Sequence, residues 1–503
     1  SPRSRVIMAA TAKASPARPG PSSASSFLSI RNKQIACLER MLNFNNAVDS
    51  RTSWQEQWKI LIYDAFCRDI ISTLFKVADL RRHGVTLHLN LHADRQPVQD
   101  ASALYLFLPS TENIDRIAKD CAAGLYDSVH LNCASSIPQS EMHDLATAVV
   151  QSESAHRIAK VVDQYMNFVS LSHNLFSLNI PDSFFAFNDP QVSDSGMDAL
   201  IDQVVKGLFA VVATLGVVPL IRFPQGNAAA EVGQRLYKRL QSHLQAPSNL
   251  FSESGAASSS HRPVLIILDR AIDLSSNLQH AWTYEAMLHD VLGMNLNKVT
   301  VADDAEGGPA GRAKPSKVYD LGVADTFWLD NMGKPFPSVT DEIEVQLNAW
   351  KREYDRIGAS GTVQDFADKG GGIEALTKAA QLVPELTERK RVLDMHTNIC
   401  TVLLAQIKER ELDNFFSLES AILSGSVYNA KSALMEVFSM QALGTAEDKL
   451  RLFLIFYLNA PNISEQDLSE YENALSQLGA DLTLMQFLKY LRKMKQLETR
   501  AMG

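Results

Sequence analysis

The stretch WKILIYD, residues 58 to 64, sets the architecture of the chain. Lys59 to Tyr63 form a β-rich run that ends at an acidic residue, Asp64. A periodic helical stretch, Asp69 to His83, comes next, and Val85 to Leu89 (VTLHL) then has the pattern of a second strand. A strand, a helix and a strand in succession predict a parallel sheet that is covered by helices on both faces.

Two further strands, Leu104 to Leu108 and Ser128 to Cys133, continue this alternation. They complete an α/β domain that we expect over residues 29–150. The preceding residues 1–28 are rich in Ser, Pro and Ala, and no acidic residue occurs before Glu39. Such a composition buries too little apolar surface to order itself, which predicts a disordered tail. Its Arg-rich, acid-free character also fits an organellar transit peptide.

A second α/β domain is predicted over residues 151–273. Its predicted elements follow one another along the chain: a helix near Ser154 to Tyr165, a helix from near Met197 to Gly207 onward, a strand at Val217 to Arg222, a helix at Ala228 to His243 and a strand at Val264 to Leu268. After this region strand signals fade and helical ones dominate. The predicted fold class is therefore α/β plus α, with two α/β domains of mainly parallel sheets and a large α-helical third domain, residues 274–503.

The third domain contains a predicted helical hairpin at about residues 339–412. Pro384 to Leu412 has no internal Gly or Pro and predicts a helix of about 29 residues. Val339 to Ile357 is also helix-like. The glycine-rich Gly358 to Gly372 between the two helices predicts a mobile tip, which would let the hairpin switch between folded-back and extended forms.

An apolar stripe runs along the longer helix of this hairpin. A helix of that length is too long to be covered by one small domain, so we expect the stripe to be reachable by partners. The stripe consists of apolar residues at helical spacing, namely Leu386, Leu393, Ile399, Leu403, Leu404 and Ile407.

Composition and charge restrict the function. The 503 residues carry 48 Lys and Arg against 57 Asp and Glu, a net charge of −9, which argues against nucleic acid as a partner. Five dispersed cysteines without a CxxC pair suit a reduced compartment. The best membrane candidate, Gly207 to Ile221, is shorter than the roughly 20 apolar residues that a span needs. We expect a cytoplasmic monomer whose membrane contact is peripheral.

Signatures of catalysis are weak in this sequence. It lacks GxxxxGK[ST], GxGxxG after a strand, GxSxG and HExxH. Asp64 and Asp269 end strands, as does the Mg²⁺-binding acid of a P-loop enzyme, but no phosphate loop accompanies them. His88 and His92 share one face of a strand without a third metal ligand nearby. We therefore expect no catalytic residues, no cofactor and no metal.

The region after Pro138 offers a different kind of site. Met142, Leu145 and Ala146 fall at i, i+3 and i+4 on one face of a predicted helix, and Ile158 on the next segment could close a pocket against them. Such a pocket would suit one aromatic anchor of a short peptide. An ordinary core face has the same pattern.

Several phrases together resemble the Sec/Munc (SM) proteins, which chaperone SNARE assembly, and within them the Sly-type branch that acts between endoplasmic reticulum and Golgi. They occur in order along the chain: WKILIYD at 58 to 64, HGVTLHL at 83 to 89, PSTENIDRI at 109 to 117, VDQYMNFV at 162 to 169, TLGVVPLIR at 214 to 222, RPVLIILDRAIDL at 262 to 274, HDVLG at 289 to 293, PELTERKRVLDMHTNI at 384 to 399 and DKLRLFLIFYL at 448 to 458. The resemblance covers about residues 30–495.

The resemblance implies an arch-shaped, non-enzymatic protein that grips a syntaxin-type SNARE. It implies an N-terminal peptide pocket at Met142, Leu145, Ala146 and Ile158, with Met142 where the branch often has Leu. It also implies that the hairpin holds SNARE motifs in register, that a tethering complex is a possible partner, and that a longer C-terminal part completes the second domain, which we therefore expect to be incomplete here.

Three classes of function remain open on the residues. The first is an SM-type SNARE chaperone. The second is an α/β enzyme that binds a nucleotide or sugar at the carboxyl ends of the strands, and the third is a general helical tether. Tight binding of a syntaxin N-terminal peptide favours the first, and specific nucleotide or sugar binding favours the second.

Overall fold

The computed structural model describes most of the chain. The described residues are 29–46, 58–246, 250–251, 262–302, 316–359, 372–425, 430–440, 443–460, 463–483 and 485–490. The predicted tail at residues 1–28 and residues 360–371 of the predicted tip lie outside them. The chain divides into two compact units: unit 1 comprises residues 1–181, 198–220 and 234–265, and unit 2 comprises residues 182–197, 221–233 and 266–503.

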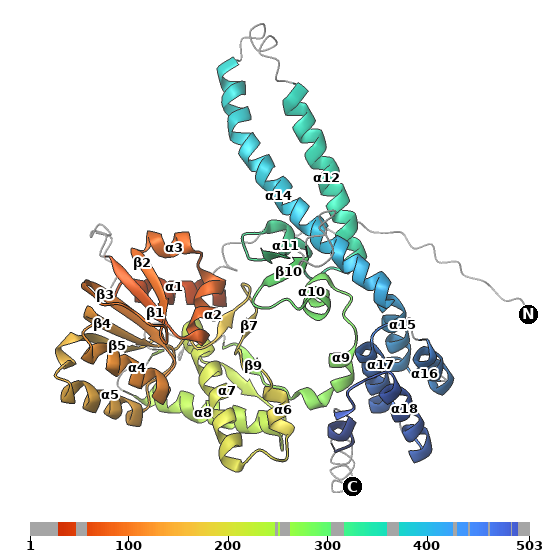
Figure 1. Ribbon diagram of the computed structural model, residues 1–503, viewed down its shortest axis with the longest axis horizontal. Coiled ribbons are helices and arrows are strands. Elements are labelled where there is room, and N and C mark those ends of the chain that lie inside the picture. Colours follow the sequence, from red (N-terminus) through yellow and green to blue (C-terminus); the bar gives the residue numbers. More distant parts are fainter. Residues whose placement is uncertain are drawn as a thin grey trace, which may run out of the picture. The chain divides into compact units, whose positions relative to one another are not determined.

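Unit 1 contains a five-stranded, all-parallel sheet with the strand order β2-β1-β3-β4-β5 (Figure 1). Its strands are β1 (Lys59–Tyr63), β2 (Val85–Asn90), β3 (Val98–Phe107), β4 (Tyr126–Cys133) and β5 (Ile158–Asp163). The first four confirm strands that were predicted from the β-rich runs. The order places β1 and β3 side by side at the centre.

Helices connect these strands. They are α2 (Ala65–Leu74), α3 (Val77–Arg82), α4 (Thr111–Ala122) and α5 (Gln139–Gln151), and α1 (Ile30–Leu42) precedes the sheet. The chain moves outward from β1 to β2 in one direction and from β3 through β4 to β5 in the other. Because parallel crossovers are right-handed, α2 and α3 cover one face of the sheet, and α4 and α5 cover the opposite face.

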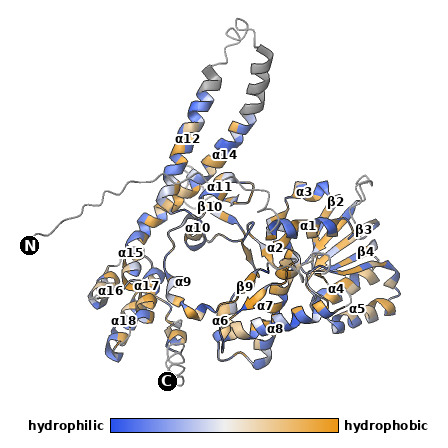
Figure 2. Ribbon diagram, turned by 180° about the vertical axis from the view of Figure 1, so that it is seen from behind, coloured by the Kyte–Doolittle hydropathy of each residue, from blue (hydrophilic) through white to orange (hydrophobic). Residues whose placement is uncertain are grey.

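The core of unit 1 lies between this sheet and its helices. Ile62, Tyr105, Leu131 and Ile117 are fully buried in it. The second half of β3, Ala103 to Phe107, is a continuous buried run, as expected for a parallel strand that is covered on both faces, and Figure 2 shows hydrophobic residues in orange within the sheet and its helices.

One element of this region contradicts its prediction. A helix was expected near Ser154 to Tyr165, but Ile158–Asp163 form β5, which pairs with β4. Its side chains alternate between half-buried and exposed along the strand, which is the period of two that distinguishes a strand from a helix. The first sheet therefore extends past residue 150.

The second α/β set contains strands and helices at the predicted Val217 to Arg222, Ala228 to His243 and Val264 to Leu268, and its described strands form two-stranded sheets. Its helices are α6 (Ser183–Asn188), α7 (Asp194–Leu215) and α8 (Ala228–Gln245), and its strands are β6 (Val169–Ser170), β7 (Phe176–Ser177), β8 (Leu220–Arg222) and β9 (Val264–Ile266). The β6–β7 pair is antiparallel. In the β8–β9 pair, Leu220 N donates to Pro263 O (2.8 Å) and Ile267 N to Arg222 O (2.9 Å), a parallel register. No larger second sheet is formed by the described segments.

The rest of unit 2 is mainly helical, as predicted, and the fold class of α/β regions plus a helical region is confirmed. The helices are α9 (Leu274–Leu278), α10 (Tyr284–Leu292), α11 (Thr326–Asn331), α12 (Phe336–Ala359), α14 (Gly372–Arg410), α15 (Leu412–Leu423), α16 (Ala430–Ser439), α17 (Ala446–Asn459) and α18 (Glu465–Gln477). An antiparallel pair, β10 (Lys298–Ala302) and β11 (Ser316–Asp320), was not predicted.

The two long helices α12 and α14 form the predicted hairpin (Figure 1). α14 begins at Gly372, twelve residues before the predicted start at Pro384, which lies inside the helix. Proline lacks one backbone donor and so removes a single helical hydrogen bond, but the flanking turns continue through it.

Candidate functional site

α5 carries apolar residues on two sides. Leu145 and Val149, four residues apart, are buried in the core of unit 1 at 2% and 4% exposure. Met142, Ala146 and Val150, also spaced by four, are exposed, with Met142 at 36% and Val150 at 66%. We call these three residues the outward α5 face. Since Leu145 and Val149 already anchor the helix, the core does not explain this second stripe.

The structure separates the four residues of the predicted pocket into two groups. Leu145 and Ile158, the first residue of β5, both pack in the core of unit 1. Met142 and Ala146 lie at the surface. Val150 was not predicted, although its spacing of four from Ala146 is the signal that finds it.

The hairpin is held together by contacts between its two helices. Trp350 Nε1 of α12 donates a hydrogen bond of 2.9 Å to the carbonyl of Leu386 on α14. The ammonium of Lys390 lies 5.6 Å from the centre of the Trp350 ring, and Tyr354 stacks on the same ring at 5.1 Å. Trp350 therefore joins the helices through both a polar and a cation–π contact.

The expectation that the apolar stripe of α14 is reachable is wrong. Leu386, Leu393, Ile399, Leu403 and Ile407 are all buried. The last four pack in one core with residues of α10, α11 and α12, such as Met287, Trp328 and Ile343. Leu404 alone among the six is exposed, at 41%. The neighbouring elements of unit 2 cover the stripe, so helix length was a poor guide to its exposure.

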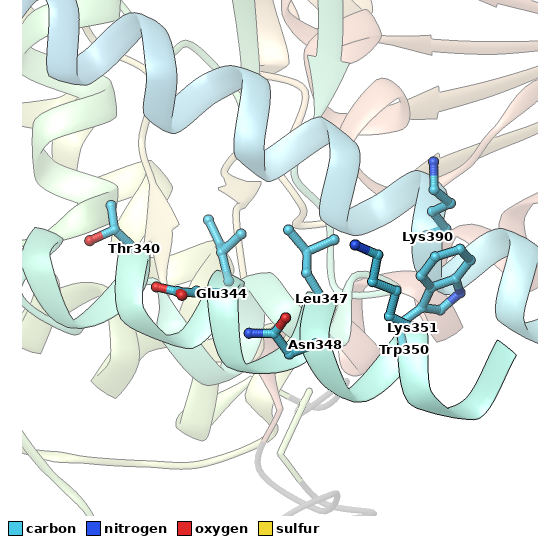
Figure 3. Close-up of a pocket in the computed structure, with 8 residues that line it drawn as sticks. Thr340, Glu344, Leu347, Asn348, Trp350, Lys351 and Lys390 are labelled. Carbon is cyan, nitrogen blue, oxygen red and sulfur yellow. The ribbon is translucent and has the colours of Figure 1, made fainter. Parts of the chain in front are cut away.

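A groove of about 420 Å³ lies along the hairpin (Figure 3). We call it the hairpin groove. Most of its lining belongs to α12, and α14 contributes one lysine: the residues are Thr340, Ile343, Glu344, Leu347, Asn348, Trp350, Lys351 and Lys390. Its lining combines apolar side chains with two ammonium groups and one carboxylate.

A buried polar cluster lies at the base of the hairpin. His280 Nδ1 lies 2.6 Å from Glu419 Oε1, and its Nε2 lies 3.0 Å from Asp448 Oδ1. Arg410, the last residue of α14, donates to both oxygens of Asp448. Because each ring nitrogen faces a carboxyl group, this arrangement favours the protonated imidazole, in which both nitrogens donate. The cluster thereby ties α14 to α15 and α17.

The charges of this cluster move two pKa values in opposite directions. Burial alone lowers the pKa of His280, but hydrogen bonds to Asp448 and Glu419 outweigh burial, and the pKa is raised above 6.5. Burial raises the pKa of Asp448, but its hydrogen bonds with His280 and Arg410 prevail, and the pKa lies well below its usual range.

We therefore predict an alkaline loss of stability that depends on His280. A raised folded-state pKa contributes stability that is fully present below the unfolded value of 6.5 and is lost as pH rises through the folded value. The stability lost is about 1.4 kcal/mol for each pKa unit by which the folded-state pKa of His280 exceeds its unfolded-state pKa. Urea unfolding of wild-type protein and His280→Gln from pH 5 to 9 should show their largest difference in free energy of unfolding at the acidic end. Parallel curves across this range would contradict the charged cluster.

The carboxyl ends of the strands show how the suspected catalytic acids are used. In α/β sheets of this strand order, ligands bind at the carboxyl ends of β1 and β3, where the chain connections leave the two strands in opposite directions. There Asp64 is buried, and its oxygens accept from Cys67 N (2.8 Å), Leu108 N (2.7 Å) and Asn113 Nδ2 (3.0 Å). Asp269 accepts from Ala271 N at 2.8 Å. Both acids thus serve as caps of the turns that follow their strands.

His88 and His92, near this edge of the sheet, also lie within hydrogen-bond distance of other side chains. His88 Nδ1 lies 3.0 Å from Tyr63 Oη, and His92 Nε2 lies 2.8 Å from Asn113 Oδ1. Over the described part of the chain, no group of three or more His, Cys, Asp or Glu could hold a metal ion. Within the same residues, no helix is long and apolar enough to cross a membrane.

The fold combines a parallel α/β sheet with a mainly helical unit that carries a long helical hairpin. The model of the Sec1 family matches residues 59–502. The Sec1 family domain-containing protein 1 of Mus musculus is 39% identical over 483 residues, which cover 92% of this chain and 75% of that protein. The chain therefore belongs to the Sec1 family.

The similarities also indicate the branch. The SEC1 family transport protein SLY1 of Arabidopsis thaliana is 40% identical over 476 residues, covering 93% of this chain and 74% of that protein. The crystal structure of Sly1p in complex with an N-terminal peptide of Sed5p matches with a TM-score of 0.73 at 29% identity, over 94% of this chain and 76% of that one. This chain is a Sly-type member of the family.

Proposed function

We propose that this Sly-type protein regulates SNARE assembly in vesicle docking and fusion, in transport between endoplasmic reticulum and Golgi, by binding the N-terminal peptide of a syntaxin-type SNARE. One observation carries the proposal: α5 presents a second apolar stripe, the outward α5 face, that its own core does not use. Sly1p, a structural relative, binds an N-terminal peptide of Sed5p.

The peptide site that we propose uses both groups of residues on α5 and β5. Met142 and Ala146 supply accessible apolar contact, and Val150 extends it along the helix. Leu145 and Ile158 support the face from the core beneath. An aromatic side chain laid on this face would bury apolar area worth about 2 to 3 kcal/mol.

The hairpin is the proposed second surface, and it would hold the SNARE motifs of an assembling bundle in register. The buried stripe of α14 serves this role indirectly, because it fixes α12 and α14 against each other. The hairpin groove supplies the direct contact. Its apolar residues Ile343, Leu347 and Trp350 fit the apolar positions of a heptad-patterned helix. Lys351 and Lys390 fit carboxylates that flank such positions.

We propose that the protein catalyses no reaction. Asp64 is the acid best placed for chemistry at the ends of β1 and β3, and internal donors occupy both of its oxygens. We further propose a cytoplasmic monomer that joins endoplasmic reticulum and Golgi membranes peripherally, through its SNARE partners and through a tethering complex.

A pull-down tests the proposed function. The immobilised protein should capture syntaxin-type SNAREs and lose most of that capture when their first few residues are removed. The same protein, titrated with ATP, GTP and nucleotide sugars, should show no specific binding. Equal capture of intact and truncated SNAREs would contradict the peptide site, and specific nucleotide binding would favour an α/β enzyme.

A further inference from the structure

Met142 is one of the few exposed methionines in the part of the chain that the structure describes. Among the methionines whose burial the structure describes, the exposed ones are Met142 on α5, at 36%, and Met440 after α16, at 45%. The rest are buried or half-buried, such as Met166 and Met197. Met142 is therefore more accessible to an oxidant in solution than the buried and half-buried methionines of the described residues.

The sulfur of Met142 also lies where its polarity matters most. Met142 belongs to the outward α5 face, on the helix whose Leu145 and Val149 are buried in the core of unit 1. A peroxide oxidises a thioether by transferring one oxygen: the peroxide O–O bond breaks, an S=O bond forms, and hydrogen peroxide leaves as water while sulfur loses two electrons. The product replaces a flexible apolar side chain by a polar one.

We propose that Met142 is a redox-sensitive site at which oxidation to the sulfoxide by a peroxide weakens binding of the SNARE peptide. This inference rests on the proposed function, and it adds a regulation of the same face. A sulfoxide oxygen covered by an apolar peptide side chain loses its hydrogen bonds to water, so affinity should fall about tenfold. The fold should tolerate the change, since the core beneath does not include Met142.

The reaction is reversible by chemistry that cells supply. Two thiols reduce the sulfoxide back to the thioether, with one disulfide and one water as the other products, and methionine sulfoxide reductases catalyse this reaction. The site therefore has the two states that a switch needs. Four of the five cysteines, Cys67, Cys121, Cys133 and Cys400, are buried, and Cys37 is half-buried.

Met142→Leu provides the control for this proposal. Leucine conserves the volume and apolar character of the side chain but has no sulfur to oxidise. Wild-type protein and Met142→Leu are treated with hydrogen peroxide, and mass spectrometry of tryptic peptides measures oxygen addition at each methionine. Affinity for a fluorescent N-terminal peptide of Sed5p is then measured before treatment, after treatment, and after reduction by a methionine sulfoxide reductase with dithiothreitol.

We expect peroxide treatment to weaken the affinity of wild-type protein for the peptide about tenfold, and the reductase to restore it. The affinity of Met142→Leu after treatment should stay within about twofold of its own value before treatment. Equal losses in both proteins would assign the effect to other methionines and overturn the proposal. Unchanged wild-type affinity with Met142 fully oxidised would overturn it too, while sparing the peptide site. If neither untreated protein binds the peptide, the peptide site itself is wrong and the switch falls with it.

Discussion

Met142→Lys should lower affinity for a syntaxin N-terminal peptide by at least about thirtyfold and leave the fold unchanged. Met142 is exposed, so a lysine there stays hydrated in the free protein. A bound apolar anchor would strip water from the ammonium without offering it a partner, a loss typical of a central interface residue, about 2 to 4 kcal/mol. Fluorescence titration measures the affinity, and circular dichroism checks the fold.

Two comparison variants sharpen this test. Met440→Lys places the same change at a similarly exposed methionine just after α16, and it should bind the peptide as wild type does. Leu145→Lys buries the charge in the core of unit 1 and should prevent folding. If Leu145→Lys instead folds normally, or if Met142→Lys unfolds, the assignment of the two sides of α5 is wrong.

Leu403→Ala should lower the free energy of unfolding by about 2 to 5 kcal/mol, whereas Leu404→Ala should lower it by less than about 0.5 kcal/mol. The two leucines are neighbours on α14 with opposite surroundings. Leu403 has no exposed surface and packs in the core shared with α10 and α12, while Leu404 is 41% exposed. Denaturant unfolding of the intact chain measures the free energy of unfolding of each variant. Hydrogen exchange at the amides of α14 then shows whether the loss lies in this helix.

The outcome decides how the α14 stripe is interpreted. Equal, small losses for the two leucines would show that the stripe is accessible after all and free to contact SNARE motifs directly. The expected inequality means that variants of the buried stripe weaken SNARE assembly through loss of structure. Direct contact must then be tested at the hairpin groove, for example at Lys351 or Lys390.

Much of the fold could be predicted because its signals are local. The strand Lys59 to Tyr63 agrees with β1 at both ends, and the hairpin follows from two long stretches on either side of a glycine-rich segment. β5 was missed because its short alternating run follows a helical pattern without a strong break. The β10–β11 pair was missed because its two strands are separated by residues 303–315, a connection much longer than the short turn that marks a hairpin in a sequence.

At the two sites, the sequence could not predict which side of each helix is buried. Periodicity places Met142, Leu145 and Ala146 on related faces of a helix, but it does not say which side the sheet covers. The same spacing identifies the stripe of α14, yet only packing against α10, α11 and α12 shows that it is covered. The His280 cluster joins residues more than a hundred positions apart, and no pattern along the chain marks such a contact.

The central claim is that the outward α5 face binds the first residues of a syntaxin-type SNARE, and a double-mutant cycle tests it most directly. Affinities are measured for wild-type protein and Met142→Lys, each with the intact SNARE cytoplasmic region and with the same region lacking its first residues. If the two changes remove one contact, either change alone should cost as much affinity as both together. Losses that add would place the first residues of the SNARE elsewhere and contradict the account.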